Sequence, residues 1–239
     1  IAPTADTDSP VLAGGYAEAA AAQANEVIVR DATLIIAKEA PSNVLTAAVL
    51  TQDVKPVNAS LYGGAGNNLA QDNTVSLTDV NINENTELTI AGGYIHDEGS
   101  ADKNEVSLTN LNLDPDSTYI SEVAGGNAYN GTANENTVAI TQETAVPVEL
   151  GDVYGGYTYE STANNNTVTL KGTEIAAAAA NTNALTPLPE KSLQADYVAG
   201  GDTWDEAANE NTVSLTQAYA YTVIGGTTGN AVANGNEVS

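Results

Sequence analysis

The sequence contains no cysteine, methionine or phenylalanine, and only one histidine and one tryptophan among its 239 residues. The absence of cysteine excludes disulfide bonds, thiolate catalysis and cysteine-ligated metal sites. Basic residues are scarce as well: 6 Lys and Arg stand against 31 Asp and Glu, which gives a formal net charge of −25. Nucleic acids and anionic membranes both require clustered basic residues, so neither is expected as a partner.

Long apolar runs are also missing. No stretch approaches the roughly 20 residues of a transmembrane helix, so we expect no direct membrane insertion. No secretion signal is visible, and Ile1 in place of a starting Met indicates a processed end or a piece of a longer chain. A core without Phe must be filled by Val, Leu, Ile and Ala, which suit the narrow space between stacked strands.

One short unit recurs seven times along the chain. Its clearest copy is Val123-Ala124-Gly125-Gly126, followed after a gap by Asn136-Thr137-Val138-Ala139-Ile140. From the first Gly of each pair to the Asn, the offsets are 11, 10, 12, 11, 11, 11 and 11 residues. Self-similarity with a period of roughly 30 residues is typical of a solenoid or a propeller. The asparagines are Asn25, Asn73, Asn104, Asn136, Asn166, Asn211 and Asn236; the glycine pairs are Gly14 and Gly15, Gly63 and Gly64, Gly92 and Gly93, Gly125 and Gly126, Gly155 and Gly156, Gly200 and Gly201, and Gly225 and Gly226.

Each unit carries two strand signals. The first strand is predicted to end at the glycine pair, where a corner needs positive φ or a close backbone approach. The second begins at the Asn, and in Asn73-Thr74-Val75-Ser76-Leu77-Thr78 the residues Asn, Val and Leu share one face. Parallel stacking then superimposes like residues in columns. A buried Asn is costly unless its amide is hydrogen-bonded, and a stacked column allows each amide to donate to the next.

The repeats run through nearly the whole chain, so we predict a single β-solenoid domain over residues 1–239. The fold class is all-β, a parallel β-helix of about seven rungs. Residues 1–10 form an extended lead-in. The Asn-to-Asn spacings of 48, 31, 32, 30, 45 and 25 residues predict two inserted loops, near residues 31–60 and 172–196. Insertions in a solenoid leave the stack on one side, either as a binding surface or through neutral drift in loop length.

The pattern Val153-Tyr154-Gly155-Gly156 followed by Asn166-Thr167-Val168-Thr169-Leu170 resembles the passenger repeats of Gram-negative autotransporter and adhesin-like surface proteins. The resemblance covers about residues 11–239. It implies a right-handed parallel β-helix on the cell surface or outside the cell, which acts as an adhesin or as a structural stalk. The partners it implies are host or cell-surface proteins or glycans. No membrane-barrel segment, protease triad or Arg-Gly-Asp tripeptide accompanies it.

Few residues indicate catalysis, and we predict that the protein is not an enzyme. The single histidine, His96, precedes Asp97 and Glu98, where a solvated loop residue is commoner than a metal ligand or an acid–base catalyst. A polysaccharide-active β-helix enzyme needs paired carboxylates on neighbouring rungs, for which Asp202 and Asp205 beside Trp204 are candidates. We expect no catalytic, cofactor-binding or metal site.

Calcium is the one cofactor with any support. Oxygen ligands are available in Asp97-Glu98, Asp114-Pro115-Asp116 and Asp202-Thr203-Trp204-Asp205. None of these stretches matches an EF-hand loop or a calcium-binding nonapeptide, and a solvated charged face is the commoner role for such residues.

Aromatic residues follow several glycine pairs. Tyr16, Tyr94, Tyr157, Tyr159 and Trp204 are expected at equivalent places, where they either stack on sugars or shield the backbone at the corner.

The two ends of the repeat array suggest a further hypothesis. Asn236-Glu237-Val238-Ser239 starts a second strand without its Leu, and no polar capping unit is evident at either end. The alternative to an adhesin is therefore a filament subunit, in which this half-unit is completed by residues 1–13 of the next copy.

Overall fold

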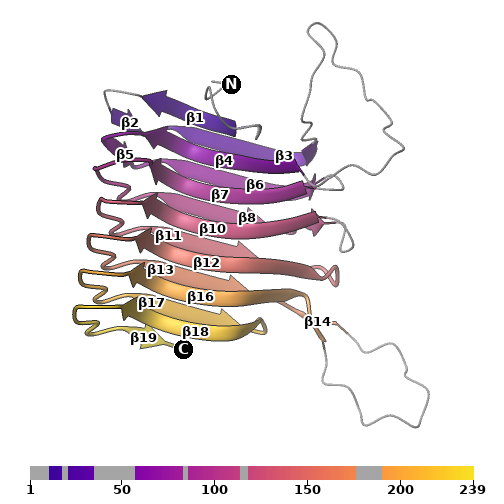
Figure 1. The fold of residues 1–239 in the computed structure, drawn as a ribbon. Helices are drawn as coiled ribbons and strands as arrows, with labels where there is room; N and C mark the ends of the chain where they lie inside the picture. Colours follow the sequence, from indigo (N-terminus) through magenta and orange to yellow (C-terminus); the bar gives the residue numbers. More distant parts are fainter. Residues whose placement is uncertain (1–10, 18–20, 35–56, 83–85, 114–117, 176–189) are drawn as a thin grey trace, which may run out of the picture.

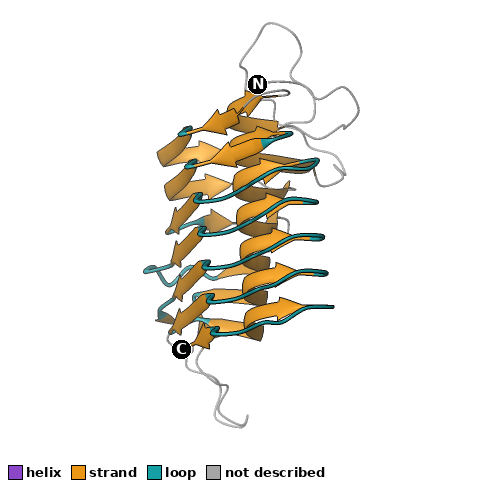
Figure 2. Cartoon of the chain, turned by 90° about the vertical axis from the view of Figure 1, so that its left-hand side faces the viewer, coloured by secondary structure: helices purple, strands orange, loops and turns teal. Residues whose placement is uncertain are grey.

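The computed structural model describes residues 11–17, 21–34, 57–82, 86–113, 118–175 and 190–239. Within these ranges every regular element is a β-strand, and the strands stack into one elongated body (Figure 1). Two large sheets lie opposite each other and run the length of the stack (Figure 2). The predicted class is confirmed at this level: the described fold is all-β, with parallel strands in stacked sheets, and is consistent with a β-solenoid.

The first sheet contains seven long strands whose spatial order follows the sequence. They are β1 (Val11–Ala17), β4 (Val57–Gly66), β7 (Thr86–Ile95), β10 (Thr118–Ala128), β12 (Val148–Thr158), β16 (Leu193–Thr203) and β18 (Tyr219–Thr228). Every neighbouring pair in this sheet is parallel.

The second sheet has eight strands, again in sequence order. Its members are β3 (Glu26–Leu34), β6 (Thr74–Ile82), β8 (Glu105–Thr109), β11 (Thr137–Thr141), β13 (Thr167–Lys171), β17 (Thr212–Thr216) and β19 (Glu237–Val238), with the short β9 (Asn112–Leu113) beside β6. Two small pairs complete the fold: the parallel β2 (Ala21–Gln23) and β5 (Leu69–Gln71), and the antiparallel β14 (Glu174–Ile175) and β15 (Glu190–Lys191).

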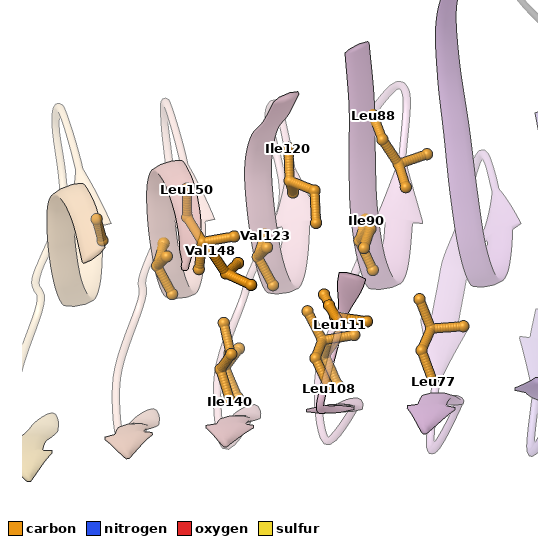
Figure 3. Packing of buried hydrophobic residues seen from close by; sticks show 14 of the residues in the cluster. Leu77, Leu88, Ile90, Leu108, Leu111, Ile120, Val123, Ile140, Val148 and Leu150 are labelled. Carbon is orange, nitrogen blue, oxygen red and sulfur yellow. The ribbon is translucent and has the colours of Figure 1, made fainter. Parts of the chain in front are cut away.

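The core lies between the two large sheets and is built from columns of identical or similar side chains. In the second sheet the predicted valine column is confirmed, because each Val is the Cα partner of the Val on the next rung. Its members are Val75, Val106, Val138, Val168 and Val213, all fully buried. Side chains from the long strands, such as Ile90 and Val123, point toward Leu77, Leu108 and Ile140 of the opposite sheet (Figure 3).

The glycine pairs do not lie where the sequence pattern placed them. Strand β12 continues beyond Gly155 and Gly156 to Thr158, so the prediction that the first strand ends at its glycine pair is wrong. Positive φ is not the reason for the pairs either, since Gly235 is the one described glycine in that region of backbone space. The second prediction, a close approach of the backbone, agrees with the geometry given below.

The predicted insertions fall mostly outside the described residues, as does the predicted lead-in of residues 1–10. Of the first insertion, the structure describes the end of β3 up to Leu34 and the start of β4 at Val57. Of the second, it describes the antiparallel pair in which Glu174 lies opposite Lys191.

Candidate functional site: polar ladders and an outer face of tyrosines and acids

The structure brings all seven predicted asparagines together in one hydrogen-bonded ladder. In each step Nδ2 of one Asn donates to Oδ1 of the Asn on the next rung, over distances of 2.9 to 3.2 Å. The same Oδ1 also accepts the backbone N–H of the preceding Asn, for example Asn136 N to Asn166 Oδ1 at 2.9 Å. Asn73, Asn104, Asn136, Asn166 and Asn211 are buried. The ladder therefore satisfies amides that would otherwise be costly to remove from water.

The glycine pairs make room for this ladder. A Cβ on Gly125 would lie 2.7 Å from Cβ of Asn136 and 2.5 Å from the carbonyl oxygen of Gly155 on the next rung. A Cβ on Gly126 would lie 2.0 Å from the carbonyl oxygen of Ala101. Each pair thus stands where two rungs and an Asn side chain approach too closely for any larger residue.

A second polar ladder lies two residues before the first and is not anticipated by the sequence analysis. Oδ1 of Asn134 accepts the backbone N–H of Asn164 at 2.7 Å, and Oδ1 of Asn164 accepts that of Asn209 at 2.7 Å. Asp102 and Asn209 accept from the next rung in the same way. These bonds run in the opposite direction to the asparagine ladder. The signal in the sequence is the Asn or Asp at position −2 from five of the seven ladder asparagines.

The residue between the two ladders has a left-handed backbone. Its φ is 58° at Glu135 and 57° at Asn165, and equivalent values occur on every rung. Only Gly235 is a glycine in this column, so six L-residues adopt a conformation that costs them free energy. The turn that presents both ladders is therefore specified by the surrounding hydrogen bonds rather than by the residue at its centre. The column consists of Ala24, Asp72, Lys103, Glu135, Asn165, Glu210 and Gly235.

The outer face of the long-strand sheet carries a cluster of tyrosines and carboxylates. In two strands, a hydrogen bond links the side chains that precede and follow a buried alanine in the sequence. In β10, Asn127 Nδ2 donates to Glu122 Oε1 at 2.6 Å, and Ala124 lies between them in the chain. One further pair, Tyr197 and Asp202, closes over Ala199 at 3.1 Å. Both alanines are fully buried although they lie on the face opposite the core.

The carboxylates on this outer face are partly buried. Burial raises the pKa of Glu122 and of Asp202, and the charge of Asp152 on the strand between them raises both further. The hydrogen bonds from Asn127 and Tyr197 act in the opposite direction. Burial likewise raises the pKa of Tyr154, whose hydroxyl donates to Asp152 at 3.0 Å. The phenols therefore remain protonated donors, and the acids remain hydrogen-bonded without a described basic partner.

The predicted aromatic residues separate into two columns. Tyr16, Tyr94 and Tyr157 occupy one register position, which they share with Ala65 and Asn127. Tyr159 and Trp204 belong instead to a column at the turn, where Tyr159 stacks on Tyr129 at 5.4 Å and on Trp204 at 6.1 Å between ring centroids. The interplanar angles are 4° and 9°, so these rings turn their faces to one another and their edges to solvent.

The remaining candidates do not form a common site. His96 is exposed, and its Nδ1 lies 3.1 Å from Asp97 Oδ1. Asp202 takes part in the cluster on the outer face, whereas Asp205 accepts from Asn230 at 2.6 Å in an exposed turn. Asp114-Pro115-Asp116 lies outside the described residues. In the part of the chain that the structure describes, no group of three or more His, Asp or Glu side chains could hold a metal ion.

No protein-family model, no curated protein and no solved structure matches this chain. Among the described residues there is no helix long and apolar enough to cross a membrane.

Proposed function

We propose that this chain is a non-enzymatic extracellular surface protein, adhesin-like or structural, built as a β-solenoid of about seven rungs with two inserted loops. The observation that carries the proposal is the asparagine ladder, which joins every rung from Asn25 to Asn236. A continuous ladder between aliphatic columns makes a stiff rod, and a rod suits a stalk or a scaffold for presenting binding loops.

The distribution of polar groups supports this function. The buried amides are used within the ladders, and the half-buried acids of the outer face accept hydrogen bonds from Asn127, Tyr154 and Tyr197. These groups stabilise the rod rather than converge on a bound substrate. The surface that remains for recognition is acidic overall, and host or cell-surface proteins or glycans are the proposed partners. The extracellular location follows from the resemblance of the repeats to autotransporter passengers.

The second insertion provides the sharpest test. Because β14 and β15 pair at its base, residues 176–189 can be replaced by a short Gly-Ser turn without disturbing the rungs on either side. We expect the full chain to bind epithelial cells or an immobilised glycan or matrix-protein array, and the replaced variant to lose that binding while it keeps its thermal midpoint. Trp204→Ala, which changes the opposite edge of the rung, is the matched control and should bind normally.

Two results would contradict the proposal. Equal binding by the full chain and by the variant without residues 176–189 would remove the role of this insertion. Release of reducing sugar from a polysaccharide, lost in a Glu122→Gln variant, would assign the chain to polysaccharide-active enzymes instead.

A further inference from the structure

We propose that Tyr129 and Tyr159 form an oxidative modification site, at which a one-electron oxidant derived from hydrogen peroxide joins the two phenol rings into a dityrosine. The two residues directly follow β10 and β12, so the crosslink ties one rung covalently to the next. This inference adds a covalent bond to the rod proposed above. It is tested on the purified chain without any host ligand, so its failure and the failure of the proposed function can be distinguished.

The two rings stand at equivalent positions on adjacent rungs. The residues that precede them, Ala128 and Thr158, are Cα partners. In the next step of the ladder, Tyr159 N donates to Tyr129 O at 2.9 Å. The ring planes are 4° apart and the ring centroids are 5.4 Å apart, close to the spacing of about 4.8 Å between neighbouring strands. The two side chains therefore point in the same direction, and their phenol edges lie side by side.

Both rings are accessible to an oxidant in solution. Tyr129 is 54 % exposed and Tyr159 is 36 % exposed. The other stacked pair of tyrosines, Tyr62 and Tyr94, has a shorter centroid distance of 4.6 Å, but Tyr62 is only 9 % exposed. Burial also raises the pKa of Tyr62 to about 12, so its phenol gives up a proton less readily. Among the stacked tyrosine pairs of the described residues, proximity and accessibility thus coincide at Tyr129 and Tyr159.

A third pair of tyrosines is exposed but has a different geometry. Tyr219 and Tyr221 have a centroid distance of 5.1 Å, and their ring planes are 83° apart. The edge of one ring therefore points at the face of the other, and the two phenol edges do not lie side by side. This pair serves as an internal comparison for the effect of ring orientation.

The neighbours of the pair confine the coupling to these two rings. The equivalent position on the preceding rung is His96, and on the following rung it is Trp204. The centroid of the Trp204 ring lies 6.1 Å from that of Tyr159. Neither neighbour has a phenol group. The stack therefore offers each tyrosine one partner for dityrosine formation.

The reaction balances with hydrogen peroxide as the oxidant. A haem peroxidase supplied with peroxide removes one electron from each phenol, and each phenolic proton passes to water, which leaves two neutral phenoxyl radicals. The unpaired electron of such a radical is shared with the ring carbons next to C–O, the Cε atoms. A bond forms between one Cε of each ring, and the hydrogens of these two carbons move to the oxygens and restore the phenols. In sum, two tyrosines and one hydrogen peroxide give one dityrosine and two water molecules.

Proximity favours coupling within one chain over coupling between chains. Groups held side by side react at effective concentrations far above those of separate molecules in solution. Two copies of the chain repel each other, since each has a net charge of −25. The crosslink closes the chain between Tyr129 and Tyr159 into a loop, which restricts the unfolded state as a disulfide does.

Treatment of the dilute purified chain with hydrogen peroxide and a haem peroxidase tests the site. We expect the blue fluorescence of dityrosine and an intact mass that is lower by two hydrogen atoms, in a product that remains a single chain of 24.3 kDa. A protease that cleaves after glutamate separates the two tyrosines, so a crosslinked pair of peptides identifies the site; the cleavage positions between them are Glu135, Glu143 and Glu149. The crosslinked chain should have a higher thermal midpoint than the untreated chain.

Tyrosine-to-phenylalanine variants assign the signal. Tyr129→Phe and Tyr159→Phe each remove one phenol but keep the stacked ring, and each should lose the dityrosine. Tyr94→Phe in the other stacked pair and Tyr221→Phe in the edge-to-face pair are the matched controls, and both should form as much dityrosine as the wild type. Circular dichroism verifies that each variant is folded. Dityrosine retained in Tyr129→Phe, a wild type that couples only between chains, or oxidation of Trp204 without a bond between the tyrosines would overturn the proposal.

Discussion

Asn104 and Asn136 lie on adjacent rungs, and Oδ1 of Asn136 accepts two hydrogen bonds from Asn104, from the backbone N at 2.8 Å and from Nδ2 at 3.2 Å. Both residues are buried. One amide oxygen thus satisfies the backbone and the side chain of the preceding rung. Its loss leaves a buried N–H without an acceptor, and such a group costs more than the net value of an ordinary hydrogen bond.

We therefore expect Asn136→Ala to lower the free energy of unfolding by about 3 kcal/mol, since two donors of Asn104 lose their acceptor together. Urea unfolding followed by circular dichroism measures the change. The matched variant is Asn236→Ala at the partly exposed end of the ladder, where water replaces the lost bonds and the expected loss is about 1 kcal/mol. Equal losses of unfolding free energy at Asn136 and Asn236 would show that the stabilisation by the ladder hydrogen bonds does not depend on their burial.

The asparagine and valine columns could be predicted from the sequence because a period of two within each strand and a fixed repeat between strands are sufficient to place them. Val138 has to face inward once Ile140 does, and parallel stacking then superimposes it on Val168. The need to satisfy a buried amide predicts the bonds between Asn136 and Asn166 in the same way.

The outer face could not be predicted by the same argument. Glu122 and Asn127 are five residues apart, and an alternating strand places them on opposite faces. They meet because the strand departs from regular alternation between Ala124 and Asn127, at the glycine pair, and alternation alone does not predict this change of face. The left-handed turn at Glu135 was missed for a related reason: its residue type carries no turn preference, and the hydrogen bonds of neighbouring rungs impose the conformation.

The left-handed turn gives a second prediction. Glu210 has a φ of 56° and an exposed side chain, so its replacement removes steric strain without loss of packing. We expect Glu210→Gly to raise the free energy of unfolding by about 1 kcal/mol, the cost of this conformation for an L-residue. The control is Glu149→Gly, an exposed position inside β12, where the same change should destabilise because glycine weakens a strand. A loss of stability at both positions would contradict the assignment of strain to Glu210.

The acids of the outer face give a third prediction, on pH. Burial raises the folded-state pKa of Glu122 and of Asp202 above their unfolded values, so the folded chain holds these protons more tightly. Their contribution to stability is complete below about pH 4 and is lost as pH rises through the raised folded values. We therefore expect the free energy of unfolding to rise as pH is lowered from neutral toward about 4, the unfolded-state value.

A double variant isolates this contribution from the general relief of acidic repulsion. Glu122→Gln with Asp202→Asn keeps the oxygen acceptors for Asn127 and Tyr197 but removes both charges. It should be more stable than the wild type near neutral pH and should show a shallower dependence on pH. Glu149→Gln, at an exposed position on β12, is the control and should leave the slope unchanged. If the unfolding free energy of the double variant depends on pH as steeply as that of the wild type, Glu122 and Asp202 are not the source of that dependence.

The stacked rings of Tyr129, Tyr159 and Trp204 give a fourth prediction. It distinguishes an aromatic stack that stabilises the fold from one that binds a sugar ring. The ring of Trp204 stacks on Tyr159, so one face of the ring is occupied. Gly229, which lies next to the ring, has no side chain to stack on it, and Trp204 is 56 % exposed. A double-mutant cycle with Trp204→Ala and Tyr159→Ala should give a coupling of about 1 kcal/mol in unfolding experiments. Because Trp204 is the only tryptophan in the chain, its fluorescence reports on this column alone, and titration with soluble oligosaccharides should leave it unchanged. A saturable change in emission would show that the exposed part of the Trp204 ring receives a sugar.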